Sequence, residues 1–408
     1  MRREAVALAA LLVAGRAAAL VGEAGDPLQV VASARTVTAV TVNHDSPLML
    51  SPDGTVHSSD GLGAALLRLQ VVARPGAGLS GDLHLVEAVS FSTAGAAGAL
   101  IAPPPARYRL LGAGVAQAHG PSTTADLLVD RAAVTWRGAG ASLTLGRQPI
   151  TFGKAHFWNA LDLFSPFAAT AFDRDYKPGV DAARLDVALG EASGLTAVAA
   201  TGRSDGVAPP GASWRGSAAL LHAYTTLAGV DLSAQGGKVQ GGWHAGAAAA
   251  GTVGPLDLRA EAAAFFPARG DALPRSVTAV AGAGHRFDSG LVLEGELLFQ
   301  GAARTGSLAE RLALEQQGRL LQASPLVIGA LAERDLTPLL HGSLGLLCSA
   351  NDGSLAILPG LTYSLSDEAD LVAGAVVGAG RRRTPAGAPG SEFGAAPDLT
   401  YVEFKAYF

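Results

Sequence analysis

The chain has 408 residues, of which 49% are apolar, 16% are charged and 6% are aromatic. Charged residues are well below the roughly 25% usual in soluble domains, and small residues, among them 52 glycines, take their place. The formal net charge of −5, from 30 basic and 35 acidic residues, argues against a nucleic-acid-binding protein, which needs a clustered basic excess. The single cysteine, Cys348, excludes an internal disulfide and a cysteine-based zinc site.

Residues 1–19 have the layout of a secretory signal peptide. Arg2 and Arg3 give a positive start, residues 5–15 form an apolar run, and residues 17–19 offer a small-residue cleavage site. The apolar run is too short for a transmembrane helix, which needs about 20 residues. A buried N-terminal helix is the alternative interpretation. We expect the peptide to be removed, so that residues 20–408 form the mature protein.

The rest of the chain alternates apolar residues with polar or small ones in segments of about 9 to 12 residues, which is the period of a β-strand. Gly, Pro, Asp or Asn separate the segments. The weakest of them are the first and the hairpin strand at 229–236, without which sixteen of the eighteen would remain. In chain order the pattern predicts strands at 29–42, 63–73, 79–91, 125–137, 141–148, 178–189, 193–203, 215–226, 229–236, 239–250, 256–266, 276–287, 291–301, 325–334, 339–349, 354–364, 369–379 and 399–408.

These strands favour an all-β fold, a transmembrane antiparallel up-and-down β-barrel of about 18 strands, with 16 as the alternative. The segments approach the 9 to 11 residues that a tilted strand needs to cross a bilayer, about twice the usual length in soluble sheets. An even strand number places both termini at one end and the long connections 43–62, 92–124, 149–177, 302–324 and 380–398 at the other, outer end. A soluble sandwich with its charged face toward water is the competing fold.

In a barrel the apolar face of each strand meets lipid and the polar face meets the lumen. Between residues 291 and 300, for example, Leu293 and Leu297 fall on one face, and Glu294 and Glu296 fall on the other. The same alternation predicts a set of lumen-facing side chains: Arg68, Asp82, His84, Arg131, Asp186, Arg259, Glu261, Glu294 and Glu296.

The last strand ends in Phe408, with Val402, Phe404 and Ala406 on one face. This ending resembles the C-terminal strand of bacterial outer-membrane barrels, which in that family is read by the outer-membrane assembly machinery. The resemblance implies a location in the bacterial outer membrane, in contact with its lipid and lipopolysaccharide.

The most unusual stretch runs from the G-R-Q at residues 146–148, through an aromatic-Gly step at Gly153 and D-x-F-x-P at 162–166, to P-G-x-D-A-x-R at 178–184. Over about 45 residues it resembles a segment of large outer-membrane porin-like barrels, including the alginate-export-like group. In those barrels the segment lies by the pore mouth or folds into the lumen. The matching positions here are Arg147, Gln148, Gly153, Asp162, Pro166, Gly179, Asp181 and Arg184.

The residues between the two strands agree with a lumen or pore-mouth segment at 149–177. Pro149, Pro166 and Pro178 cannot donate sheet hydrogen bonds, and charged irregular backbone cannot face hydrocarbon. Charges near a constriction select among permeating solutes. Alternatively, these charges pair with one another and only hold the segment in place. The candidates are Arg147, Gln148, Lys154, Asp162, Asp173, Arg174, Asp175, Lys177, Asp181 and Arg184.

We therefore predict a porin-like channel for passive diffusion of small hydrophilic solutes, with no catalytic residues, metal or cofactor. The alternatives are a non-conducting structural or adhesive barrel and an outer-membrane hydrolase. For the hydrolase, residues 57–60 contain His, Ser and Asp, but neighbours in sequence seldom form a triad. Residues 308–317 have helical spacing and predict a short helix in an outer loop.

Overall fold

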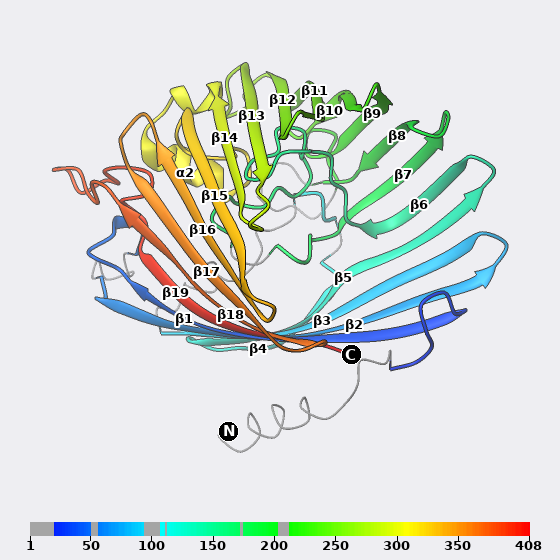
Figure 1. Cartoon of the computed structure of the whole chain (residues 1–408), viewed down its shortest axis with the longest axis horizontal. Coiled ribbons are helices and arrows are strands. Elements are labelled where there is room, and N and C mark those ends of the chain that lie inside the picture. The colour runs from blue at the N-terminus through cyan, green and yellow to red at the C-terminus, as the bar shows by residue number, and fades with distance from the viewer. Residues whose placement is uncertain (1–19, 50–55, 94–106, 111, 172–173, 203–211) are drawn as a thin grey trace.

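The computed structural model describes residues 20–49, 56–93, 107–110, 112–171, 174–202 and 212–408. The predicted signal peptide lies outside the described residues. The described part forms one antiparallel sheet of nineteen strands, eighteen of which close into a barrel because β1 pairs with β19 (Figure 1). The strands are β1 (Leu28–Val42), β2 (Ser59–Gly76), β3 (Leu79–Ser92), β4 (Gly114–His119), β5 (Thr123–Gly138), β6 (Ala141–Gln148), β7 (Val180–Ala188), β8 (Ser193–Ala200), β9 (Ala218–Leu227), β10 (Val230–Val239), β11 (Gly242–Val253), β12 (Leu256–Pro267), β13 (Ser276–Arg286), β14 (Val292–Gln300), β15 (Leu326–Thr337), β16 (Leu340–Ser349), β17 (Leu355–Ser366), β18 (Ala369–Ala379) and β19 (Asp398–Tyr407).

The predicted eighteen-stranded barrel is confirmed. Each predicted strand overlaps one barrel strand, and the bounds of β6 and β18 agree at both ends. The two segments that the sequence supported least, β1 and β10, are both part of the wall, so the sixteen-stranded alternative is wrong. The two-residue periodicity of the sequence was therefore sufficient to predict the barrel and its number of strands.

One strand, β4, was not predicted. It pairs with residues 124–128 of β5, on the edge opposite to β3. β6 pairs only with residues 132–138 of β5 and ends at Gln148, because Pro149 cannot donate a sheet hydrogen bond. β4 therefore extends along the edge of β5 that β6 has left, outside the closed set of eighteen strands.

The two ends of the barrel differ. At one end, here called the turn end, strands are joined by two to five residues, and β1 begins and β19 ends there. The opposite end, here called the loop end, carries the long connections, including 43–58, 149–179, 301–325 and 380–397. Loop 301–325 contains the 3-10 helix η3 (Gly301–Arg304) and the predicted helix, α2 (Leu308–Gln316), and loop 43–58 contains η1 (Pro47–Met49). In the described part of the chain, no helix combines the length and apolarity that crossing a membrane requires.

The wall presents an apolar outer face and a polar inner one. Leu293 and Leu297 of β14 are exposed on the outside, while Glu296 between them is buried inside the barrel. A broad set of exposed apolar side chains covers the outer surface, for example Leu67, Val134, Leu185, Leu258, Ile328, Leu344, Leu361 and Val402. Such a face is stable against hydrocarbon and would be costly in water.

Candidate functional site

Residues 149–179, here called the lumen segment, run inside the barrel between β6 and β7 (Figure 1). Their described residues contact strands on opposite sides of the wall, β12 and β14 on one side and β1, β2 and β19 on the other. Only a segment within the barrel can reach both sides.

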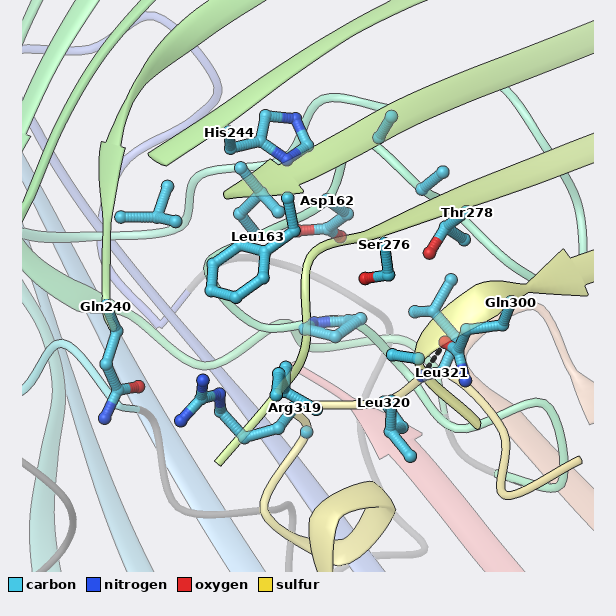
Figure 2. A pocket seen from close by; sticks show the side chains of 18 of the residues that line it. Asp162, Leu163, Gln240, His244, Ser276, Thr278, Gln300, Arg319, Leu320 and Leu321 are labelled. Atoms are coloured by element: carbon cyan, nitrogen blue, oxygen red, sulfur yellow. Dashed lines mark hydrogen bonds between the residues drawn. The ribbon is translucent and has the colours of Figure 1, made fainter. Parts of the chain in front are cut away.

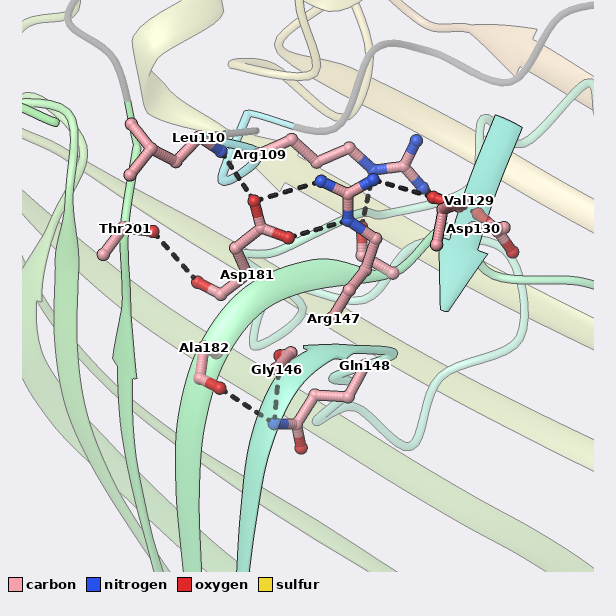
Figure 3. A network of polar contacts seen from close by, with 11 residues as sticks. Arg109, Leu110, Val129, Asp130, Gly146, Arg147, Gln148, Asp181, Ala182 and Thr201 are labelled. Carbon is pink, nitrogen blue, oxygen red and sulfur yellow. Dashed lines mark hydrogen bonds and ion pairs between the residues drawn. The ribbon is translucent and has the colours of Figure 1, made fainter. Parts of the chain in front are cut away.

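An ion pair holds the two points where the lumen segment leaves and rejoins the wall (Figure 3). Arg147 and Asp181 lie opposite each other on β6 and β7, and the guanidinium donates to the two carboxylate oxygens at 2.7 and 3.1 Å. Arg147 also donates to the carbonyl of Val129, and the backbone N–H of Leu110 donates to Asp181. Arg147 therefore joins β5, β6 and β7 at the point where the lumen segment begins.

Two further residues of the resembling motif support the same junction. The amide of Gln148 donates to the carbonyls of Thr144 and Ala182, which satisfies backbone groups where regular pairing ends. Gly179 approaches the wall closely, since an added Cβ would lie 2.4 Å from the carbonyl oxygen of Asp130. These motif positions therefore have structural reasons for their residue types.

Two wall carboxylates hold the first half of the lumen segment. Glu261 of β12 accepts the backbone N–H groups of Lys154, Ala155 and Leu161, the last two at 3.0 and 3.2 Å. Glu296 of β14 accepts those of His156 and Phe157, the latter at 2.8 Å. Hydrogen bonds to a charged acceptor contribute about 1.5 to 3 kcal/mol each. Both carboxylates were predicted to face the lumen; there they bind the segment, and Glu261 is only 2% exposed.

The same half of the segment packs against the wall through apolar side chains. Trp158, Leu161 and Phe164 are almost completely buried and belong to one cluster with Leu298 of β14 and Val327 of β15. The indole of Trp158 donates to the side chain of Gln322 in loop 301–325 at 3.0 Å. This side of the lumen is therefore occupied by a packed apolar core.

Several charges of the lumen segment are used within it. Lys177 forms a buried ion pair with Asp162, and Arg174 donates to the carbonyls of His156, Ala168 and Ala169. Lys154 lies 3.4 Å from Asp231 of β10. Asp173 lies outside the described residues. Lys177 and Asp162 therefore fit the alternative in which the charges pair with one another and hold the segment in place. Arg174 holds the segment through backbone carbonyls, and it forms no salt bridge with the residues that the structure describes.

The end of the segment crosses to the opposite wall. The Asp175 carboxylate accepts hydrogen bonds from Arg35 of β1 at 2.6 Å and from Lys405 of β19 at 2.9 Å. The guanidinium groups of Arg35 and Arg68 lie over the ring of Tyr176, at 4.8 and 4.1 Å from its centroid. We call the group formed by Arg35, Arg68, Lys405, Asp175 and Tyr176 the crossing cluster.

The neighbouring strands add further charge beside the crossing cluster. Asp130 of β5 pairs with Arg68 and with Arg109, at 2.8 and 2.6 Å. Asp82 pairs with His84 on β3. Arg131 forms no salt bridge or hydrogen bond with any residue in the described ranges, although Asp82 and Asp130 are close enough to affect its charge.

The remaining predicted lumen residues pair along the wall nearer the turn end. Arg184 pairs with Asp186 on β7 at 2.8 Å, and Arg259 of β12 bridges Glu294 and Glu296 of β14. His156 of the lumen segment also reaches Glu294, at 3.3 Å. The effect of these charges on permeating solutes stays a prediction.

Three members of the crossing cluster were not predicted from the sequence, namely Arg35, Tyr176 and Lys405. Lys405 lies on the polar face of the last predicted strand, and Arg35 lies within the first, so strand alternation could have placed both in the lumen. Nothing in the sequence places Tyr176 beside two arginines, because that contact depends on where a long irregular segment ends.

The hydrolase alternative gains no support from its candidate residues. His57 lies 3.1 Å from Asp60, but the same carboxylate accepts hydrogen bonds from Asn43 and Thr93. Asp60 therefore ties together the loop ends of β1, β2 and β3. In the described ranges, no group of three His, Cys, Asp or Glu residues is arranged to hold a metal ion.

Comparison with known proteins identifies relatives by fold only. No family model matches the sequence, and no curated protein matches it. Among solved structures, the barrel is similar to a BenF-like porin from Pseudomonas fluorescens Pf-5, with a TM-score of 0.58, 8% identity and coverage of 94% of this chain and 99% of that one. Acinetobacter baumannii OccAB4 gives a TM-score of 0.56 at 9% identity, covering 94% and 99%. Pseudomonas aeruginosa OpdK, solved with vanillate, gives 0.55 at 11% identity, covering 93% and 98%. The chain has the fold of bacterial outer-membrane porins.

Proposed function

We propose that the protein is an outer-membrane channel through which small hydrophilic solutes diffuse passively, with a preference for anions. The fold supports the channel, because an eighteen-stranded barrel is wide enough to leave a passage beside a folded segment. The first half of the lumen segment packs against β12–β15, and only its end reaches the opposite wall. We therefore place the passage along the charged wall formed by β19, β1, β2, β3 and β5.

The observation that carries the anion preference is the crossing cluster. Asp175 is 41% exposed as a side chain and lies between two cations, in the position that a solute carboxylate would take. A permeating carboxylate can exchange with it, because the same donors on Arg35 and Lys405 serve either partner. The aromatic face of Tyr176 keeps the two guanidinium groups in place during the exchange.

The balance of charge around this wall favours anions locally. Five cationic side chains face four carboxylates there, and low-dielectric walls focus their field even though the whole chain is acidic. The five cations are Arg35, Arg68, Arg109, Arg131 and Lys405, and the four carboxylates are Asp82, Asp130, Asp175 and Glu403.

Reversal potentials in a salt gradient across a planar bilayer test this proposal. We expect an anion-selective wild type, and a shift toward cations in Arg68→Gln combined with Arg131→Gln. The matched control is Arg269→Gln combined with Arg381→Gln, which removes two exposed charges at the loop end. A cation-selective wild type, or equal shifts in both double variants, would contradict the preference. Vanillate, the solute bound to OpdK, is a suitable first carboxylate for transport assays.

Several finer expectations belong to the same proposal. The motifs between Arg147 and Arg184 resemble those of alginate-export-like barrels, but their structural roles support no alginate assignment. The backbone of Phe408 pairs with that of Ala32, so the last strand reaches the barrel seam, where the assembly machinery would act. We further propose that residues 1–19 are cleaved on export and that lipopolysaccharide surrounds the loop end.

A further inference from the structure

The outer face of the barrel carries a row of aromatic side chains at the loop end of β11, β12 and β14. Gln300 of β14 lines a cavity inside the barrel (Figure 2), so strand alternation places the preceding residue, Phe299, on the outer face. In the same way Phe265 of β12 lines the cavity and Phe266 faces outward. Trp243 of β11 lies opposite Phe266 in the sheet, and both are exposed. Aromatic rings in such a row mark the level at which a barrel wall meets the membrane surface.

Two arginines lie over these rings. The guanidinium of Arg275, the residue before β13, is 4.9 Å from the ring centroid of Phe266, and that of Arg304 in η3 is 5.2 Å from the ring centroid of Phe299. Both arginines are exposed, and neither forms a salt bridge or a side-chain hydrogen bond in the part of the chain that the structure describes. A guanidinium that lies over a ring still has N–H groups at its edge to donate. We call Trp243, Phe266, Phe299, Arg275 and Arg304 the rim patch.

The carboxylates of the two adjoining loops, 268–275 and 301–325, have other partners. Asp271 is buried and pairs with Arg319 at 2.6 Å. Glu310 accepts the hydrogen bonds that cap the start of α2, and Glu315 accepts from the side chain of Gln322. The rim patch therefore presents two cations beside the apolar outer face. An anionic group at the edge of the hydrocarbon layer is the partner that complements both its charge and its position.

We propose that the rim patch binds phosphate groups of lipopolysaccharide in the outer leaflet of the membrane. Arg275 and Arg304 would each donate to the oxygens of one phosphate, and the aromatic rings would contact the start of the acyl chains. Guanidinium groups pair with phosphate through two parallel hydrogen bonds, which an ammonium cannot form. The inference rests on the proposed orientation of the barrel, with its loop end outward, and assigns named residues to the lipid that surrounds that end.

The spacing of the two arginines favours a lipid with more than one phosphate. Sheet register places Phe299 level with Ala262, which is four positions before Phe266 on β12, and β13 lies between the two strands. A strand spacing of about 4.8 Å and a rise of about 3.3 Å per residue put the two rings roughly 16 Å apart. A phospholipid with one phosphate contacts one arginine at a time. Lipid A, the lipid part of lipopolysaccharide, carries two phosphates on a disaccharide and can contact both.

Native mass spectrometry of the purified full-length protein, with diphosphoryl lipid A, monophosphoryl lipid A or phosphatidylglycerol added to the micelles, tests the proposal. We expect diphosphoryl lipid A to bind most tightly. Arg275→Gln combined with Arg304→Gln should weaken its binding about 25-fold, because each arginine near a membrane surface contributes a factor of about five. Unchanged affinity in this double variant would overturn the site. Phosphatidylglycerol binding as tight as that of diphosphoryl lipid A would overturn the assignment to lipopolysaccharide.

Arg286→Gln combined with Arg334→Gln is the matched control, because it removes two exposed charges toward the turn end of β13 and β15. It should leave the affinity for diphosphoryl lipid A unchanged, and an equal loss in both double variants would mean that net charge attracts the lipid instead of the rim patch. Arg275→Lys combined with Arg304→Lys should bind with intermediate affinity, since it keeps the charge and loses the paired hydrogen bonds. Conductance is measured separately: a channel without lipid A binding disproves only the rim patch, and lipid A binding without conductance disproves only the channel.

Discussion

Replacing Glu261 by alanine should release the first half of the lumen segment. Its carboxylate accepts three backbone N–H groups of the segment, those of Lys154, Ala155 and Leu161, inside a site from which water is nearly excluded. Losing these charge-assisted bonds and leaving buried donors without acceptors should cost about 3 to 5 kcal/mol of segment docking. That range corresponds to a shift of roughly a hundredfold or more in the docked population.

Single-channel conductance and a spin-label distance between the segment and the wall report this release. Glu261→Ala should give larger or noisier conductance and a broadened distance distribution. Glu261→Gln should lie between it and the wild type, because one oxygen can still accept from Lys154 and Ala155. Asp257→Ala is the matched control, since Asp257 lies on the same strand and its side chain binds only Thr252 in the described structure. If Glu261→Ala keeps wild-type conductance and distances, the carboxylate does not hold the segment.

Three further predictions concern the wall, the junction and the outer loops. Leu297→Arg, at an outer position that is 43% exposed, should destabilise the barrel in lipid by about 2 to 4 kcal/mol in a folding titration. Glu294→Gln should destabilise it far less. Equal losses of stability would mean that the outer face does not meet lipid. Arg147→Met should lower the free energy of unfolding by about 3 to 5 kcal/mol in the same titration, because it leaves Asp181 without its main partner. It should not change ion selectivity. Altered selectivity with unchanged stability would mean that Arg147 acts on permeating ions. Burial and the nearby Glu392 carboxylate raise the pKa of Glu315 well above its usual value of 4.5. The folded loops therefore keep a proton that the unfolded chain releases. The stability of these loops should fall as the pH rises above about 4.5. Proteolysis of the α2 loop across this pH range should show the loss in the wild type and a weaker dependence in Glu315→Gln; protection that increases with pH would contradict the sign.

The barrel could be predicted from the sequence because each strand can be recognised from its own residues. An apolar residue at every second position and a turn residue at each end locate a strand without knowledge of its neighbours. β4 lacked that evidence, since Gly114–His119 contains one large apolar residue in a long loop. It forms because β6 ends early and leaves an edge of β5 free, which is a property of the tertiary structure.

The candidate site was predicted less completely, because the residue types indicated charge near the lumen but not its partners. Arg147 and Asp181 are paired by sheet register, a relation that becomes visible only when both strand bounds are known. Glu261 and Glu296 bind backbone N–H groups of the lumen segment, and the sequence of that segment does not show which N–H groups lack partners. Side chains that depend on the path of an irregular segment therefore need a three-dimensional structure.

Single-channel recording of the purified wild-type protein in a planar bilayer tests the central claim most directly. A passage along the charged wall beside the lumen segment predicts discrete, steady conductance steps in simple salt. A protein that inserts into the bilayer as a folded barrel and gives no steps would show that the lumen segment closes the lumen, and the structural or adhesive barrel would then be the correct account.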